Sequence, residues 1–285
     1  MTDLFANWLN ILINCDLNVP NNIIFAFLNE IIMKNTYQAA AEQLLNNRIK
    51  EPKKIRLAAE LVPQDIEQVH NIQAEMINLR EDTVIGWKCL EPLNPEQYIL
   101  APIFADTLQS GEQCALFSQN GKARVEPEIA FVLGADLPAN EAGYSIAEID
   151  DAVKSCHMAL ELMQNRYIDQ SDITFYEKLA DGLVNQGLYI GPEIDKDAAY
   201  AASEINITFS QEAGVQSFEG KHPNMSPPKP LYWLINYMAK RGVSFTAGQA
   251  FITGSFAGIV EAEMNQTTEI EYQGLGKYQV TFIQK

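Results

Sequence analysis

The feature that most constrains the fold of this 285-residue chain is a change in the spacing of its apolar residues near residue 83. Before that point, apolar residues recur at helical spacing in two segments: Ala40, Leu44 and Leu45 in the first, and Ile66, Val69, Ile72 and Met76 in the second. Such spacing is typical of amphipathic helices. Asp65 lies directly before the second segment and is a predicted N-cap. We therefore predict a helical N-terminal region over residues 1–80.

The rest of the chain consists mostly of short β-branched and aromatic runs separated by Gly, Pro and Asn. These runs are TVIGWK, YILAPIF, ALFS, IAFVLG, LYIG, INITFS, AFITGS and YQVTFI. Many short strands of this kind are typical of a sheet that rolls up or forms a sandwich. Two helices are expected among them, over residues 145–158 with a capping box of Ser145 and Glu148, and over residues 230–241. The prediction is an α+β protein with a mixed β-roll or β-sandwich over residues 81–285.

The first 34 residues are apolar, but they match neither a secretory signal nor a membrane span. Asp3, Asp16 and Pro20 interrupt the apolar stretch, and no Lys or Arg precedes Lys34. A signal has a basic start and an unbroken apolar centre, whereas a membrane span needs about 20 consecutive apolar residues. We expect two short helices here that pack on the body or on a neighbouring subunit, in a protein without a membrane partner.

The charge balance argues against a nucleic-acid partner. The chain has 20 Lys and Arg against 37 Asp and Glu, a net charge of -17, which is the wrong sign for contact with phosphates. Most of this surplus fits a solvated surface, and part of it could hold a cation. The 4 cysteines lie far apart with no Cys-x-x-Cys pair, which argues against a zinc cluster or a dense disulfide framework. A reducing, cytoplasmic setting is therefore expected.

Two glutamates stand two positions apart in the segment VEPEIAFVLG. Glu126 and Glu128 precede its apolar run, and the period of a strand places both carboxylates on one face. Two such charges repel each other unless water solvates them or a cation lies between them. Carboxylate oxygens suit Mg²⁺, Mn²⁺ or Ca²⁺ rather than zinc. The spacing thus indicates either a solvated strand face or half of a metal site.

Two further charged residues lie inside apolar runs and therefore need partners. Glu161 stands in MALELM, where burial without a partner costs free energy, and neutralisation by Arg166 is the simplest explanation. Lys88 in VIGWKCL either extends to the edge of the sheet or contacts a substrate. Neither a GxGxxG nor a Walker motif occurs, so the sequence gives no support for nucleotide binding.

In order and spacing, these segments resemble the fumarylacetoacetate hydrolase superfamily, and within it the branch of 2-oxopent-4-enoate hydratases and 4-oxalocrotonate decarboxylases. The resemblance runs from about residue 36 to the C-terminus. Its most specific segments are VEPEIAFVLGADL (125–137), ALELMQNRYID (159–169) and KLADGLVNQGLYIG (178–191). It implies the mixed β-roll of that superfamily, a small 2-oxo acid as substrate, and a homo-oligomer.

The resemblance also implies a metal site. In that branch, the glutamates of the ExE and ALE motifs coordinate Mg²⁺ or Mn²⁺, which carries over to Glu126, Glu128 and Glu161. A 2-oxo acid can chelate such an ion through its carboxylate and keto oxygens, and the ion then stabilises the enolate through which hydration, decarboxylation and C–C cleavage all pass.

By the same resemblance, five residues are expected at the substrate. Lys88 matches a lysine that contacts substrate, and Asp106 lies in the matching acidic loop and is a candidate for proton transfer. Thr253, in the ITGS turn, matches a threonine near the substrate carboxylate, although a turn hydroxyl that caps its own backbone is the alternative. Asn165 and Arg166 follow the ALE motif and are expected to bind substrate.

The chain departs from the family pattern on the substrate side. Leu90 stands where a glycine is expected, Gln164 and Asn165 replace an Asp-Ser pair, and Gly182 replaces an asparagine. We expect a carbon–oxygen lyase that hydrates a 2-hydroxy-2,4-dienoate. A 4-oxalocrotonate-type decarboxylase and a catalytically degenerate partner subunit are the alternatives.

Overall fold

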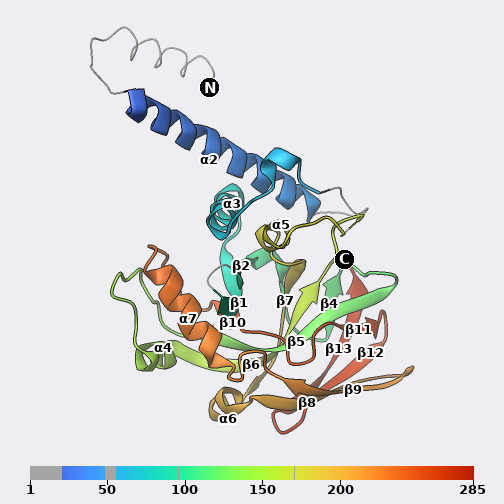
Figure 1. The fold of residues 1–285 in the computed structure, drawn as a ribbon. Helices are drawn as coiled ribbons and strands as arrows, with labels where there is room; N and C mark the ends of the chain where they lie inside the picture. Colours follow the sequence, from blue (N-terminus) through green and yellow to red (C-terminus); the bar gives the residue numbers. More distant parts are fainter. Residues whose placement is uncertain (1–20, 49–55, 95–96, 170) are drawn as a thin grey trace.

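The computed structural model describes residues 21–48, 56–94, 97–169 and 171–285. No helix within these ranges is long and apolar enough to cross a membrane. The architecture is a mixed α+β fold with two curled sheets, as predicted (Figure 1).

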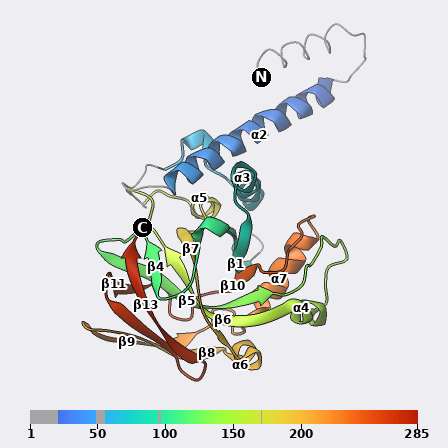
Figure 2. The same ribbon diagram turned by 180° about the vertical axis from the view of Figure 1, so that it is seen from behind.

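The N-terminal region is helical and packs on the β-sheet core through one hydrophobic cluster. Helix α2 (Asn21–Asn47) packs on α3 (Ile66–Leu79), and α3 in turn lies against α5 (Phe175–Ala180). The cluster buries residues from each helix and from the adjoining strand: Ala40, Ala41, Leu44, Val69, Ile72, Met76, Phe104 and Leu179. Figures 1 and 2 show that the N-terminal half of α2 extends beyond the body of the molecule. The boundary at residue 80 stays a prediction.

Two local expectations for this region had different outcomes. The predicted cap of α3 is confirmed, because the Gln68 backbone N–H donates to Asp65 Oδ1 over 2.8 Å. The expectation of two short helices before residue 35 is wrong for its second half, since residues 21–34 belong to one continuous helix with the segment that follows. Residues 1–20 lie outside the described part of the chain.

The large sheet places the strands that carry the candidate site side by side. Its strands are β1 (Val84–Asn94), β2 (Gln97–Phe104), β3 (Leu108–Gln109), β5 (Lys122–Leu133), β6 (Val153–Met163), β7 (Asn185–Ile194), β10 (Ala250–Ile252) and β11 (Val260–Glu263). Their order is β2-β1-β10-β5-β6-β7-β3, with β11 also paired to β5. The β1–β10 and β3–β7 pairs are parallel and the others are antiparallel. Gly86 permits the close β1–β10 approach, because a Cβ there would collide with the Ala250 carbonyl oxygen.

A smaller sheet packs against the large one. It contains β4 (Gln113–Leu116), β8 (Glu204–Gln211), β9 (Gly214–Lys221), β12 (Thr267–Tyr272) and β13 (Gly276–Gln284), in the order β4-β13-β12-β8-β9. One hydrophobic core joins the two sheets and includes buried residues of both, such as Phe131 and Phe282. Figures 1 and 2 show this sheet on one side of β5 and β6, with α4 (Ile146–Ala152) and α7 (Pro228–Ala239) on the other.

The helix predicted over residues 145–158 is correct at its start and wrong at its end. The capping box of Ser145 and Glu148 is present, but α4 ends at Ala152 and β6 begins at the next residue. Strand β6 lies between β5 and β7 and is buried along nearly all of its length, so it lacks the alternation by which a half-exposed strand is recognised. Sheet pairing, which is not local, decides its conformation.

Candidate metal and substrate site

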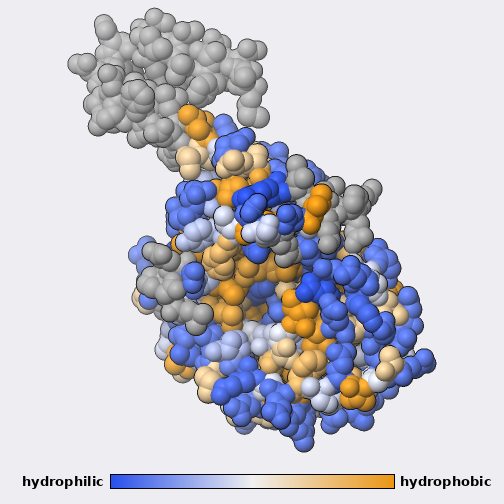
Figure 3. Space-filling view, turned by 45° about the vertical axis from the view of Figure 1, so that its right-hand side comes forward, coloured by the Kyte–Doolittle hydropathy of each residue, from blue (hydrophilic) through white to orange (hydrophobic). Residues whose placement is uncertain are grey.

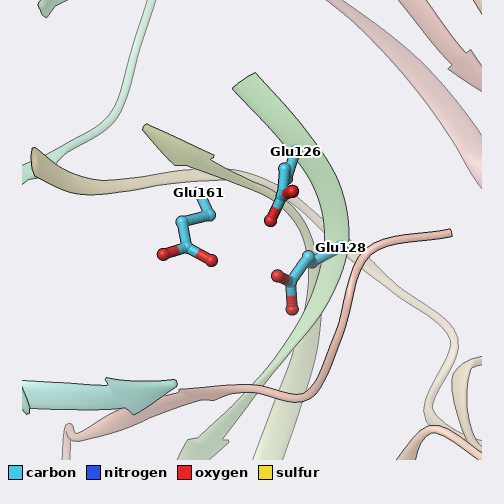
Figure 4. A group of neighbouring side chains, drawn as sticks. All are labelled: Glu126, Glu128 and Glu161. Atoms are coloured by element: carbon cyan, nitrogen blue, oxygen red, sulfur yellow. The ribbon is translucent and has the colours of Figure 1, made fainter. Parts of the chain in front are cut away.

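Three glutamates converge at the junction of β5 and β6. The register of this antiparallel pair places Glu126 opposite Glu161 and Glu128 opposite Ala159. One carboxylate oxygen from each glutamate lies within 4.8 Å of the others, and Figure 4 shows the three side chains pointing toward one space. The structure therefore brings together all three predicted metal ligands.

The carboxylates are largely withdrawn from water, which makes their shared charge unfavourable. Glu128 and Glu161 are 2% and 1% exposed, while Glu126 is half-buried. Burial and the nearby Glu161 raise the pKa of Glu126 to about 7, and burial together with both other glutamates raises the pKa of Glu128 well above its usual value. A set of hard oxygen donors crowded in this way fits a divalent cation.

Protein groups hold two of the carboxylates in place. The Lys88 Nζ lies 2.5 Å from Glu161 Oε1, and the Gly254 backbone N–H donates to Glu128 Oε2 over 2.6 Å. Gly254 has a φ of 124°, and a Cβ there would lie 2.6 Å from Leu90. The turn that carries this N–H therefore requires glycine.

A cavity of about 400 Å³ adjoins the cluster. The three glutamates and Lys88 supply its charged groups. The large apolar side chains that line it are Leu90, Ile99, Met163, Leu183, Pro223 and Ile252. The arrangement can bind a small anion next to a cation and shelter an apolar tail.

Arg166 has a different partner from the predicted one. Its Nε lies 2.7 Å from Asp181 Oδ2, and its two terminal nitrogens donate to the backbone oxygens of Asp181 and Asn185. Neutralisation of Glu161 by Arg166 is therefore wrong, because Lys88 is the cation at Glu161. The Asn165 Oδ1 accepts the Tyr167 N–H. Neither Asn165 nor Arg166 lines the cavity at the three glutamates, so their contact with substrate stays a prediction.

Neither Thr253 nor Asp106 lines the cavity at the three glutamates. Thr253 is 1% exposed, and its Oγ1 lies 3.4 Å from His222 Nε2 rather than capping its own turn. The side chain of Asp106 is 57% exposed and pairs with Arg80 over 2.7 Å. Asp106 lines another cavity, of about 230 Å³, together with Arg80. Its role in proton transfer stays a prediction.

Asn185 is a functional candidate that the sequence analysis missed. Its Nδ2 donates to Glu161 Oε1 over 2.8 Å, and Asn185 is only 2% exposed. Glu161 Oε1 thus accepts from both Asn185 and Lys88. Asn185 belongs to KLADGLVNQGLYIG, one of the segments on which the family resemblance rests. Only the β6–β7 pairing, however, brings Asn185 to Glu161.

We expect the Asn185→Leu variant to bind Mn²⁺ about 10- to 100-fold more weakly, because the donor that orients Glu161 is lost. Isothermal titration calorimetry measures the affinity, and circular dichroism confirms folding. Gln186→Leu is the matched control, since that buried amide donates to the backbone at Phe117 and Met163 and not to the carboxylates. An unchanged affinity in Asn185→Leu, or an equal loss in both variants, would contradict this role.

Comparisons with known proteins show the family of this chain. Residues 93–283 match the model of the fumarylacetoacetate (FAA) hydrolase C-terminal family. The TodF product hydratase of Pseudomonas putida F1 is 26% identical over 193 residues, covering 67% of this chain and 70% of that protein. The 2-hydroxyhexa-2,4-dienoate hydratase of Comamonas testosteroni is 26% identical over 233 residues, covering 76% and 86%.

A solved structure shows the same fold. The 4-oxalocrotonate decarboxylase from Pseudomonas putida G7, complexed with magnesium and adipate, superposes with a TM-score of 0.71 at 17% identity, over 87% of this chain and 98% of that one. The match to the family model covers well over half of the sequence. The resemblance inferred from the motifs is thereby confirmed, and this chain belongs to the fumarylacetoacetate hydrolase family.

Proposed function

We propose that this protein is a divalent-metal-dependent lyase that adds water to a 2-hydroxy-2,4-dienoate through its 2-oxo form. The observation that carries the proposal is the cluster of Glu126, Glu128 and Glu161 beside Lys88 at a cavity. The names of the hydratases to which the chain is similar support the same reaction. The three glutamates would hold Mg²⁺ or Mn²⁺, which when bound supplies Lewis-acid polarisation of a 2-oxo acid.

The residues of the chain have separate tasks in this reaction. Lys88, 6% exposed and fixed by Glu161, places a positive charge at the cavity, where it can stabilise negative charge on the substrate oxygens. Gly254 and Asn185 hold Glu128 and Glu161 in position. The apolar wall with Leu90 can pack against the carbon chain of the substrate.

The lining of the cavity favours a hydratase over a decarboxylase of a dicarboxylate. Lys88 is the one cation among the described residues that line it. A second substrate carboxylate at the distal end would meet Leu90, Ile99, Met163 or Leu183 instead of a charge partner. Burying such a group without a partner costs free energy, so a monocarboxylate with a short apolar tail fits better.

The test is an ultraviolet assay with enzymatically generated 2-hydroxypenta-2,4-dienoate, with and without Mn²⁺. We expect metal-dependent loss of the dienol absorbance with 4-hydroxy-2-oxopentanoate as product. We also expect kcat/KM for this monocarboxylate to exceed that for 4-oxalocrotonate by about tenfold or more, since the unpaired carboxylate must be desolvated.

Preferred turnover of 4-oxalocrotonate with release of CO₂ would instead establish the decarboxylase. If no 2-oxo acid were turned over although Mn²⁺ bound, the degenerate-subunit alternative would stand.

We also propose a homo-oligomer in which the N-terminal helices contact a second subunit. Ile32 and Met33 on α2 are 59% and 39% exposed, and Leu79 at the end of α3 is 39% exposed. Figure 3 shows apolar side chains in this region and in a band below it, flanked by hydrophilic ones. Exposed apolar groups of this kind mark contact surfaces.

We expect the Ile32→Glu/Met33→Glu double variant to dissociate into smaller species in light scattering coupled to size exclusion, because two charges would be buried at the contact. Val215→Glu on the hairpin of β8 and β9 is the control, since it changes a similarly exposed apolar residue elsewhere. An unchanged mass of the double variant would contradict the proposed contact.

A further inference from the structure

A second cavity, of about 410 Å³, lies between α3, α7 and β1. It shares no lining residue with the cavity at the three glutamates. Its walls are mostly apolar and come from all three elements and the turn after α7: Ala74, Ile77, Val84, Met238 and Val243. We call it the α3–α7 cavity. Its size is in the range of pockets that bind small molecules.

Trp87 lines the α3–α7 cavity, and its indole nitrogen is buried in the wall. The residue is 4% exposed, and its Nε1 has no hydrogen-bond partner among the described residues. A buried indole N–H usually has a partner, because leaving it unpaired costs free energy. Protein atoms cover this nitrogen, so Trp87 contributes the surface of its ring to the cavity rather than a donor.

A cation also lines the α3–α7 cavity. The guanidinium of Arg241 stacks on the ring of Tyr237 at 3.6 Å from the centroid, and its Nη1 donates to the Tyr237 backbone oxygen. No carboxylate of the described residues lies within ion-pair distance of Arg241. Because Tyr237 holds the guanidinium in place, Arg241 can receive an anion with little loss of side-chain freedom.

Arg241 is the one Lys or Arg among the described residues that line this cavity. The His70 Nε2 is already hydrogen-bonded to Tyr98, and the Gln249 side chain bonds to the backbone at Val84 and Thr246. Glu67, on the first turn of α3, is exposed and is the one carboxylate among the described lining residues. An apolar cavity with an exposed guanidinium at its edge suits an anion that carries an apolar body.

We propose that the α3–α7 cavity binds a small aromatic or alicyclic monocarboxylate. Its ring would pack on the apolar walls beside Trp87, and its carboxylate would accept a hydrogen bond from Arg241. This site is separate from the proposed catalytic site and does not depend on its reaction. The two sites share a strand, since Trp87 and Lys88 are neighbours on β1 and line different cavities.

The test uses the full chain in EDTA, with benzoate as the probe and NMR of the tryptophan indole N–H groups as the readout. The sequence has 3 tryptophans, so the signal missing from Trp87→Phe identifies Trp87. We expect a saturable shift of that signal. The affinity should fall about tenfold or more for benzamide, and likewise for benzoate with Arg241→Gln, because a charge-assisted hydrogen bond is lost.

A matched pair of variants locates the binding. Ala74→Trp fills the mouth of the cavity from an exposed position on α3 and should abolish the shift, while Asn78→Trp, also exposed on α3 but outside the lining, should retain it. Three results would overturn the proposal: no saturable shift of the Trp87 signal, an equal shift in Ala74→Trp, or equal affinity for benzamide. A shift that survives in Ala74→Trp but is lost in Glu126→Gln would assign benzoate to the three glutamates, and that also overturns it.

Discussion

The Glu126→Gln variant should lose tight Mn²⁺ binding and turnover while remaining folded. Glutamine keeps the shape of the side chain, and no described residue donates a hydrogen bond to the Glu126 carboxylate, so folding loses little. The cluster loses one of its three anionic ligands. We expect the dissociation constant for Mn²⁺ to rise by more than about 100-fold. Loss of a group that only orients a metal ligand weakens metal binding by up to about that factor, and loss of a ligand itself should cost more.

The same residue should make metal binding depend on pH. Because the pKa of Glu126 is about 7 in the metal-free protein, against an ordinary value of 4.5, a proton must leave before the metal binds. The affinity for Mn²⁺ should therefore fall as the pH drops below about 7. Without metal, the folded state holds this proton more tightly than the unfolded state, so the contribution of Glu126 to stability is full below about pH 4.5 and is lost as the pH rises to about 7.

Calorimetric titrations with Mn²⁺ on either side of neutral pH test the loss of affinity in Glu126→Gln and the dependence of affinity on pH, and chemical denaturation without metal tests the stability. Glu219→Gln, an exposed residue on β9, is the matched control and should bind metal like the unaltered protein. Unchanged Mn²⁺ affinity in Glu126→Gln would remove the basis for the metal site.

Replacing Lys88 with methionine should have the second large effect. Lys88 is buried and lies 2.5 Å from Glu161, so its loss leaves that buried carboxylate without a cation. We expect the metal-free variant to be less stable by about 3–5 kcal/mol, the usual cost of removing one partner of a buried ion pair. Mn²⁺ should recover much of this loss, because the metal supplies the missing positive charge.

Turnover by Lys88→Met should fall even with saturating Mn²⁺. We expect kcat to drop by about 100-fold or more, as when a positioned donor to a developing negative oxygen is removed. Chemical denaturation and the dienol assay measure the two effects. Lys154→Met, which changes an exposed lysine on β6, should alter neither. Full activity in Lys88→Met would exclude the proposed role, and unaltered metal-free stability would exclude the ion pair.

Much of the fold follows from local signals. The spacing of Val69, Ile72 and Met76 correctly predicts the buried face of α3, and Asp65 and Ser145 correctly mark where two helices begin. Polar strands are harder to predict from the sequence. Strand β9 is mostly exposed, so it lacks the apolar alternation by which strands are recognised.

Part of the site follows from the sequence by itself. Glu126 and Glu128 share a face because side chains on a strand alternate, and this holds wherever the strand lies. The apolar context of Glu161 correctly indicates that it needs a partner, but it does not identify that partner. Arg166, close in sequence, was the natural candidate, yet its charge is taken by Asp181.

Only the tertiary structure decided how these groups meet. The β5–β6 register places Glu161 opposite Glu126, although 34 intervening residues could close at many registers. Lys88 reaches Glu161 across β10 and β5, and Asn185 reaches it from β7. The sequence alone determined that charged residues lie within apolar strands, and that Glu126 and Glu128 share one face of a strand. Both follow from the local alternation of side chains and from the local apolar context. Strand order and register determined the partners, because they arise from packing between distant segments.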